Sequence, residues 1–233
     1  AEASKRIPAY QLPAVWFPYR KMGMSTTDIL ADSTKGKFGP FAGQLFCGEF
    51  TMSFVSRVFL EKVDGEYQGA CFRFREGLDC AALRLQWGAN GSMYIGQSNR
   101  GWNSLGTKSY GLQRLQWTGK MPFEIKSMSA KRNGFRLSFT QMLDAGTAIK
   151  PESYTLKSYT YPYQSKYGGE PVDVKTHKVQ FGGLDALSPF IDLTVDELRE
   201  GYVYELHAHG VRNKNDQPLL HSAAYYTLNR VPK

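Results

Sequence analysis

The feature that most constrains this sequence is the stretch of residues 83–117, which has the pattern of strand, turn, strand, loop and strand. Hydrophobic residues alternate with polar ones on the approach to Asn90-Gly91, a dipeptide that tolerates the two positive φ angles of a type I′ turn. We therefore predict a tight hairpin here. A long glycine-rich loop follows over residues 97–112, and a third strand ends at Trp117. Such loops on β scaffolds often form binding surfaces.

Earlier strand-like runs give residues 1–120 the repeating pattern of propeller blades. Asp64-Gly65 supplies a second hairpin turn, and the prolines before residue 25 favour an extended edge segment over a helix. Short antiparallel strands at even spacing are typical of β-propellers, in which four strands make one blade. The runs predicted as strands are 44–50, 56–63 and 67–74.

Residues 121–233 have a different pattern, which predicts an immunoglobulin-like β-sandwich. Seven short alternating runs in this length match the strand number and size of such a sandwich. The predicted strands are 123–128, 134–140, 153–160, 178–181, 191–195, 202–209 and 223–231. The whole chain is therefore expected to be all-β.

Composition and charge narrow the classes of partner. Hydrophobic residues make up 42% and aromatic residues 14% of the chain, which favours an ordered globular protein, and no apolar run is long enough to span a membrane. The formal net charge is +8, and residues 1–120 hold 15 Lys and Arg against 9 Asp and Glu. This excess favours anionic partners such as acidic glycans or a carboxylate-bearing cofactor. Nucleic acid is not the expected partner, because no dense basic run or recognition motif occurs.

The first residues and the cysteines bear on the compartment. Ala1-Glu2-Ala3 suits the mature end left by cleavage of a signal peptide, which favours a periplasmic or extracellular location. Cys71 and Cys80 bracket a strand end and a turn, so in an oxidising compartment they could form a disulfide. Buried free thiols are the alternative.

Residues 13–120 resemble the closing blades of the glucose/sorbosone dehydrogenase-like β-propellers of large secreted bacterial proteins, which are often joined to a c-type cytochrome. The motifs GPFAGQLF and NRGWNSLG carry the resemblance. It implies a six-bladed propeller that holds pyrroloquinoline quinone (PQQ) and oxidises a sugar or alcohol. The later motifs LSFTQMLDAGTAIKPESYTLKSY and YVYELHAHGVRNKNDQPL also resemble bacterial Ig-like domains.

The chain departs from the propeller family in three ways. At about 40 to 45 residues per blade, it supplies only two to three blades and cannot close a ring. The family's catalytic histidine has no counterpart here, and no C-x-x-C-H haem motif is present. We therefore expect a fragment or subunit that is inactive alone and that another chain or precursor segment completes.

The long loop carries the residues predicted to bind a cofactor. An arginine or lysine would pair with the carboxylates of the cofactor, and a tryptophan would stack on its ring. The alternative is that these side chains pin the loop to a neighbouring blade. The predicted residues are Asn99, Arg100, Trp102 and Lys108.

Metal ligands are also considered. His207 and His209 share one face of a predicted strand and His221 opens the next, so the three imidazoles could bind zinc or copper. A solvent-facing polar stripe is the alternative. Candidate calcium ligands are Asp192, Asp196 and Glu197, although they lack EF-hand spacing.

Two functional hypotheses follow from the sequence. One is a part of a quinoprotein-type dehydrogenase that contributes a cofactor mouth and docking surfaces. The other is a non-catalytic extracellular assembly or glycan-binding module.

Overall fold

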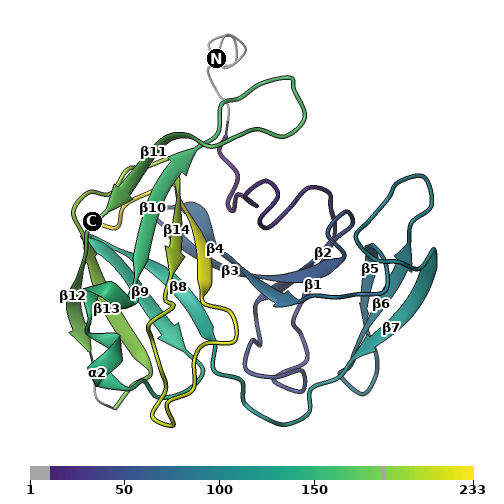
Figure 1. The fold of residues 1–233 in the computed structure, drawn as a ribbon, viewed down its shortest axis with the longest axis horizontal. Helices are drawn as coiled ribbons and strands as arrows, with labels where there is room; N and C mark the ends of the chain where they lie inside the picture. The colour runs from purple at the N-terminus through teal and green to yellow at the C-terminus, as the bar shows by residue number, and fades with distance from the viewer. Residues whose placement is uncertain (1–10, 185–186) are drawn as a thin grey trace. The chain divides into compact units, whose positions relative to one another are not determined.

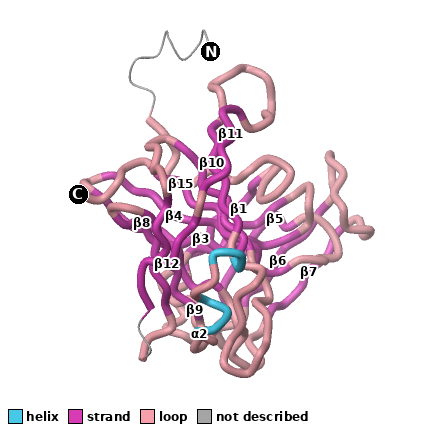
Figure 2. The backbone as a smooth tube through the Cα atoms, turned by 60° about the vertical axis from the view of Figure 1, so that its left-hand side comes forward, coloured by secondary structure: helices cyan, strands magenta, loops and turns pink. Residues whose placement is uncertain are grey.

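The structure is a computed structural model that describes residues 11–184 and 187–233. All its sheets are antiparallel, and within the described residues helix occurs as two short turns, α2 (Ala145–Ala148) and η1 (Pro151–Ser153) (Figure 2). The all-β prediction is therefore confirmed at this level. The prediction that residues 1–3 are the mature end left by cleavage of a signal peptide concerns residues outside the described ranges.

The chain forms two compact units, and each is described by itself. The basic unit, named for its charge, consists of residues 20–59 and 71–122. The terminal unit contains residues 1–19, 60–70 and 123–233. The predicted boundary between residues 120 and 121 lies beside the division at residue 122, but the two earlier segments of the terminal unit could not be assigned to it from sequence.

The basic unit is built from two runs of strands that follow chain order (Figure 1). One run has the neighbour order β1-β2-β3-β4, and the other forms a three-stranded sheet with the order β5-β6-β7. The later part of β3 and the first part of β4 belong to the terminal unit. The strands are β1 (Thr26–Ala31), β2 (Leu45–Glu49), β3 (Phe54–Val63), β4 (Glu66–Arg75), β5 (Ala82–Trp87), β6 (Met93–Ser98) and β7 (Tyr110–Leu115).

The turn between β3 and β4 has the predicted geometry. Asp64 and Gly65 both have positive φ angles, of 47° and 90°, as a type I′ turn requires. The two-residue hairpin predicted there is confirmed.

The turn between β5 and β6 differs from the prediction. Trp87 pairs with Met93, so five residues form the loop, and Gly91 is the residue in it with a positive φ angle, of 79°. The amide of Gly88 donates to the carbonyl of Ser92, and this bond closes a wider loop. The predicted type I′ turn at Asn90-Gly91 is therefore wrong, although the hairpin itself is present.

The two sheets of the basic unit enclose a common hydrophobic core. Aromatic rings dominate one part of this core: the ring centroid of Phe38 lies 5.4 Å from that of Phe46 and 4.9 Å from that of Trp87. Each fully buried side chain of this size stabilises the fold by about 1.5 to 3 kcal/mol. The buried members are Phe38, Phe41, Phe46, Val55, Leu78, Ala82, Leu85, Met93 and Ile95.

The terminal unit contains two facing sheets. One has the order β12-β13-β9-β8, and the other has the order β4-β15-β14-β10-β11, with β4 contributed by residues 66–70. The ring centroid of Phe135 in β9 lies 5.0 Å from that of Tyr204 in β14 and 5.2 Å from that of Tyr226 in β15. Aromatic rings therefore fill the space between the sheets. The strands are β8 (Ile125–Lys131), β9 (Gly134–Phe139), β10 (Thr155–Thr160), β11 (Val172–His177), β12 (Val179–Leu184), β13 (Phe190–Val195), β14 (Tyr202–His207) and β15 (Ala223–Leu228).

Two strands were not predicted, and some, among them β14, were predicted too long. Strand β1 precedes residue 44, where the first strand is predicted, and β11 is a largely exposed edge strand whose sequence has little hydrophobic signal. Strand β14 ends at His207, so His209 lies in the following turn. The expectation that both histidines share a strand face is therefore wrong.

Candidate functional site

All four residues predicted to bind a cofactor lie in the loop that joins β6 to β7. The side chain of Asn99 makes hydrogen bonds within the loop and at its base. Its Oδ1 accepts hydrogen bonds from the Ala81 amide at 3.2 Å and the Ser104 hydroxyl at 2.6 Å, and its Nδ2 donates to the Lys108 carbonyl at 2.8 Å. Asn99 therefore fixes the loop shape.

Lys108 is held by an ion pair at the base of the loop. Its Nζ lies 2.9 Å from Oδ2 of Asp79, and its amide donates to the Asp79 carbonyl at 3.0 Å. The hydrogen bond to this carboxylate raises the pKa of Lys108. Lys108 is therefore a support of the loop in this structure.

Arg100 and Trp102 remain exposed at the loop tip, on either side of Gly101. Trp102 is 63% exposed, and neither side chain makes a hydrogen bond, ion pair or ring contact with another described residue. Of the four predicted residues, these two are placed to meet a ligand. An indole and a guanidinium could bind a planar anion by stacking and by paired hydrogen bonds.

The loop that carries these side chains is tightly anchored. The amide of Leu105 donates to the Thr51 carbonyl at 2.8 Å, and that of Gly106 donates to the Ser53 hydroxyl at 3.0 Å. A Cβ on Gly106 would lie only 2.3 Å from the Cα of Cys80. The loop therefore requires glycine at position 106.

The sheet β5-β6-β7 also presents an open face that sequence reasoning missed. Tyr110 is 79% and Leu112 is 72% exposed, and Arg114 is exposed beside them. The registers place Arg84 and Tyr94 on the same face, because Tyr94 pairs with Arg114. The alternation of Tyr110, Leu112 and Arg114 with Gly111 and Gln113 was a usable signal for this face.

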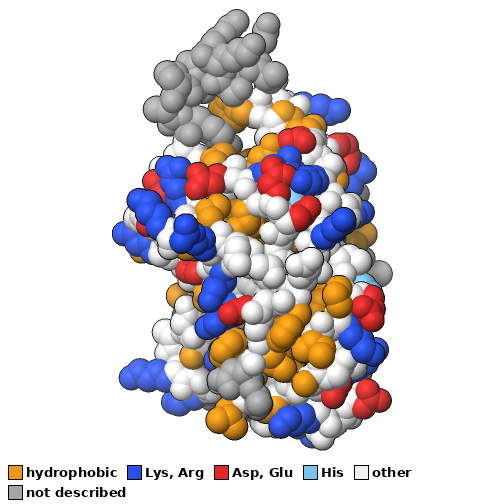
Figure 3. Space-filling model, turned by 90° about the vertical axis from the view of Figure 1, so that its left-hand side faces the viewer, with side chains coloured by type: hydrophobic (Ala, Val, Ile, Leu, Met, Phe, Trp, Pro, Cys, Tyr) orange, Lys and Arg blue, Asp and Glu red, His pale blue; other side chains and the backbone are white. Residues whose placement is uncertain are grey.

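Charge is concentrated in the basic unit. It contains 12 Lys and Arg against 5 Asp and Glu, a net charge of +7, whereas the terminal unit contains 17 against 16, a net charge of +1. No acidic residue occurs from Cys80 to Pro122. The face drawn in Figure 3 instead has acidic and basic side chains interspersed. An anionic ligand is therefore expected on the basic unit.

The histidines considered as metal ligands have carboxylate partners of their own. His207 Nε2 lies 3.0 Å from Glu205, and His221 Nδ1 lies 2.7 Å from Glu124. Among the residues that the structure describes, no cluster of three His, Cys, Asp or Glu could hold a metal ion. The structure does not bring the three histidines together as one ligand set.

The three carboxylates considered for calcium are also engaged. Asp192 binds Arg136 through two hydrogen bonds of 2.7 and 2.8 Å, which lower its pKa. Asp196 accepts from His177, and Glu197 pairs with Lys175. Each would have to leave a basic or imidazole partner to bind a cation.

All three cysteines are buried free thiols in the structure. This is the alternative to the predicted disulfide between Cys71 and Cys80. Burial raises the pKa of Cys47 to about 12 and that of Cys71 further still. Cys80 is also fully buried. None has the environment of a reactive thiolate.

A Ser-His-Asp arrangement in the terminal unit was not recognised from sequence. The Ser158 hydroxyl lies 2.7 Å from His177 Nε2, and His177 Nδ1 lies 2.9 Å from Asp196. Arg199 donates to the Ser158 hydroxyl at 2.6 Å. Since Ser158 and the His177 ring have no exposed surface, no substrate can reach this hydroxyl, and the network is structural.

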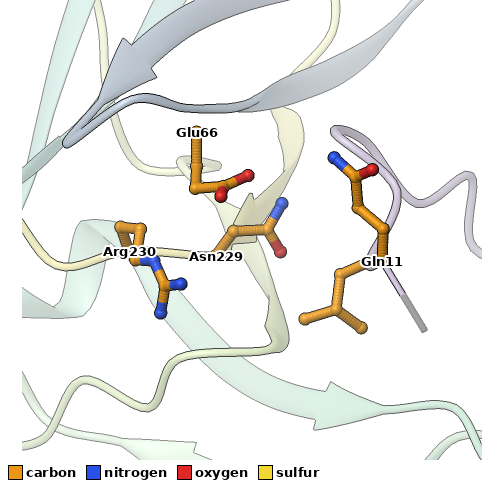
Figure 4. A pocket seen from close by; sticks show the side chains of 5 residues that line it. Gln11, Glu66, Asn229 and Arg230 are labelled. Atoms are coloured by element: carbon orange, nitrogen blue, oxygen red, sulfur yellow. The ribbon is translucent and has the colours of Figure 1, made fainter. Parts of the chain in front are cut away.

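A small polar hollow of about 230 Å³ lies in the terminal unit beside the start of the described chain. Figure 4 shows Gln11, Glu66, Asn229 and Arg230 around it. Asn229 Nδ2 donates to the carbonyls of Pro13 and Tyr67, so it ties the N-terminal segment to the unit. The hollow is smaller than most ligand sites.

Comparisons with protein-family models, curated proteins and solved structures give no match. Within the described part of the chain, no helix is both long and apolar enough to cross a membrane.

Proposed function

We propose that this chain is the C-terminal part of a secreted bacterial glucose/sorbosone dehydrogenase-like β-propeller, followed by an Ig-like domain. It contributes ligand-contact and docking surfaces to a larger assembly and has no turnover alone. The observation that carries the proposal is the strand arrangement of the basic unit. There the sequential run β1-β2-β3-β4 shares its core with the three-stranded sheet β5-β6-β7.

Adjacent propeller blades are sequential antiparallel sheets packed face to face, and the basic unit has one four-stranded and one three-stranded element of this kind. A fourth strand for the second element would have to join an open edge. The β5 edge is covered, because Thr27 donates to the Ala82 carbonyl and Asp28 accepts from the Leu85 amide, each at 2.8 Å. The open edge is therefore β7.

Backbone geometry identifies which groups of β7 are available. The Asn99 amide donates to the Ser109 carbonyl, so these two residues form a hydrogen-bonded pair. In an antiparallel ladder hydrogen-bonded and non-hydrogen-bonded pairs alternate. The N–H and C=O groups of Tyr110, Leu112 and Arg114 therefore point away from β6. A strand from another segment or chain would pair with these groups.

The Ig-like assignment is supported by strand order. Lettering β8 to β15 as A, B, C, C′, D, E, F and G gives the sheet orders A-B-E-D and G-F-C-C′, as in immunoglobulin-like sandwiches, with β4 added beside G. Tyr204, in the position of strand F, accepts a hydrogen bond of 2.6 Å from the Arg199 amide in the preceding corner. This bond corresponds to the tyrosine corner of such domains.

In this proposal, Arg100 and Trp102 contact a planar anionic cofactor of the PQQ type, and Asn99 and Lys108 maintain the loop. The absence of acidic residues from Cys80 to Pro122 fits an anionic group. When bound, the quinone would supply the oxidising chemistry. This chain would bind and orient one side of it, and the missing blades would supply the remaining contacts.

Native mass spectrometry of the protein from its source organism tests the proposal. We expect these residues in a larger precursor or complex, periplasmic or extracellular, that is isolated together with a c-type cytochrome. That assembly should bind PQQ, with calcium present, and oxidise sugars. Replacing Arg100 or Trp102 with Ala should weaken quinone binding at least about tenfold, and Lys214→Gln in the terminal unit should not. A complete assembly that neither binds quinone nor oxidises sugars would refute the proposal.

The open face of β5-β6-β7 favours a second candidate, a non-catalytic module that binds an acidic glycan. Tyr110 and Leu112 offer apolar contact for sugar rings, and Arg84 and Arg114 would pair with carboxylates or sulfates. Affinity electrophoresis in gels that contain an acidic or a neutral polysaccharide tests it. Retardation by the acidic gel alone, lost in Tyr110→Ala, is expected.

A further inference from the structure

A second basic site lies in the basic unit, at the turn between β5 and β6. A hollow of about 330 Å³ opens there, within the size range of small-molecule sites. We call it the lysine pocket. Its walls come from the loop that precedes β2 and from the β5–β6 turn, and they include Lys35, Lys37, Trp87, Gly88, Ala89 and Gly91.

The lysine pocket is separate from the loop that carries Arg100 and Trp102. The β5–β6 turn lies where β6 begins, at Met93, whereas the long loop starts where β6 ends, at Ser98. Six residues of extended strand span about 20 Å. A ligand at one end of β6 therefore does not occupy the other end, and this inference does not depend on the proposed function.

The lysine-bearing loop is held in shape by its own hydrogen bonds. Oδ1 of Asp32 accepts from the Thr34 amide at 2.9 Å and from its hydroxyl at 2.7 Å, and the Gly43 amide closes the loop on the Asp32 carbonyl at 3.1 Å. Lys35 and Gly36 both have positive φ angles, of 55° and 87°. The loop is therefore preorganised, which lowers the entropy cost of binding.

Two positions of the turn that lines the lysine pocket have no room for a side chain. A Cβ on Gly91 would lie 2.8 Å from the Cβ of Lys37, and one on Gly88 would lie 2.6 Å from the Tyr94 ring. Trp87 is fixed by its indole N–H, which donates to the Ala31 carbonyl at 2.7 Å. The pocket thus has a rigid aromatic wall and a floor without bulky side chains.

The charge of the lysine pocket has one sign. Lys35 and Lys37 are exposed, and no acidic residue is among those that line the pocket. The one acidic residue between Ile29 and Gly48 is Asp32, which is buried and turned toward Thr34. The two ammonium groups therefore face no competing carboxylate on the pocket lining.

We propose that the lysine pocket binds an oxyanion, a phosphate, sulfate or carboxylate, carried by a small molecule about the size of a monosaccharide. Lys35 and Lys37 pair with the oxyanion. Trp87 and the glycine-lined floor accept the flat apolar part of the ligand. The ligand binds without covalent chemistry.

NMR titration of the full chain at low salt tests this proposal, with inorganic phosphate, inorganic sulfate, glucose and glucose 6-phosphate as probes. We expect saturable shifts of the Gly36, Gly88 and Gly91 amides with glucose 6-phosphate. Inorganic phosphate and sulfate should bind at least about threefold more weakly, and glucose should not bind.

Three variants separate binding from folding. Lys35→Gln/Lys37→Gln and Ala89→Glu should each weaken binding of glucose 6-phosphate at least about tenfold, without a change in melting temperature. Ala89→Gln is the matched control for the introduced charge, and Lys214→Gln for lost positive charge; both should bind as the parent chain does.

Several results would overturn the proposal. Absence of saturable shifts with glucose 6-phosphate is one, and unchanged affinity in the double lysine variant is another. Equal affinities for inorganic phosphate, sulfate and glucose 6-phosphate would indicate an adventitious ion only and would also refute it.

Discussion

Replacing Tyr204 with Phe tests the corner of the terminal unit on which the Ig-like assignment depends. Tyr204 is fully buried, and its hydroxyl accepts the 2.6 Å hydrogen bond from the Arg199 amide. It also lies 3.4 Å from the Glu197 carbonyl, to which it donates. Burial raises the pKa of Tyr204 to about 12, so the hydroxyl stays protonated at neutral pH.

The expected loss follows from these contacts. Phe keeps the ring and its packing on Phe135, so no large cavity forms, and the change removes the hydroxyl alone. The Arg199 amide then loses its acceptor in a partly buried position, which costs about 1 to 3 kcal/mol. For a chain of this size, each kcal/mol lowers the melting temperature by about 2 to 4 °C.

Tyr202→Phe is the matched control, because it removes the same group from an exposed position. The Tyr202 hydroxyl donates to Asp173 at 2.5 Å at the surface, where such a bond contributes less than about 1 kcal/mol. Calorimetry gives the stability of both variants. Amide exchange at Arg199 reports the corner itself and should accelerate in Tyr204→Phe alone. Equal stability of the two variants, with unchanged Arg199 exchange, would refute the reasoning.

Three further predictions concern other parts of the chain. Gly106→Ala places a Cβ 2.3 Å from the Cys80 Cα, so we expect a loss of about 1 to 3 kcal/mol in urea unfolding, and an unchanged midpoint would contradict it. Burial raises the pKa of Cys47 from 9.0 to about 12, so its contribution to stability is complete below pH 9 and falls as pH rises from 9 toward 12. Iodoacetamide should label Cys47 only after unfolding, and rapid labelling of the folded chain would count against this. The Arg136 contact lowers the pKa of Asp192 below 3.8, so its stabilisation is present above about pH 4 and is lost as pH falls through the lowered value. Asp192→Asn should cost about 0.5 to 1 kcal/mol at pH 7 after allowance for solvent screening, and little at pH 2 in chemical denaturation; an equal loss at both pH values would argue against the ion pair.

Hairpins were predictable where the turn alone sets their geometry. Asp64-Gly65 has the two positive φ angles that the sequence predicts, and a Cβ on Gly65 would meet no atom within 4 Å. At Gly91, the approach of Lys37 and the bond between Gly88 and Ser92 impose a longer loop. These contacts come from another segment or a wider closure, and a dipeptide pattern does not contain them.

The candidate site was predictable in part. Glycine content and basic and aromatic side chains, among them Arg100 and Trp102, identified the loop as a candidate binding surface. The sequence did not distinguish these residues from Asn99 and Lys108, whose roles depend on Asp79 and on carbonyl groups that the fold brings to them. Side-chain type was readable, but the hydrogen-bond partner of each side chain was not.

The all-β class, most strands and the concentration of positive charge in the first half follow from the sequence alone. These properties depend on alternation, turn residues and composition, which act over a few residues at a time. Which distant segments join is evident only in the folded chain. The Trp16 amide donates to the Thr227 hydroxyl at 2.8 Å and attaches the N-terminal segment to the terminal unit. The Ser158-His177-Asp196 network and the lysine pocket also form only in the folded chain. Each requires backbone segments far apart in the chain to meet at hydrogen-bonding or van der Waals distance.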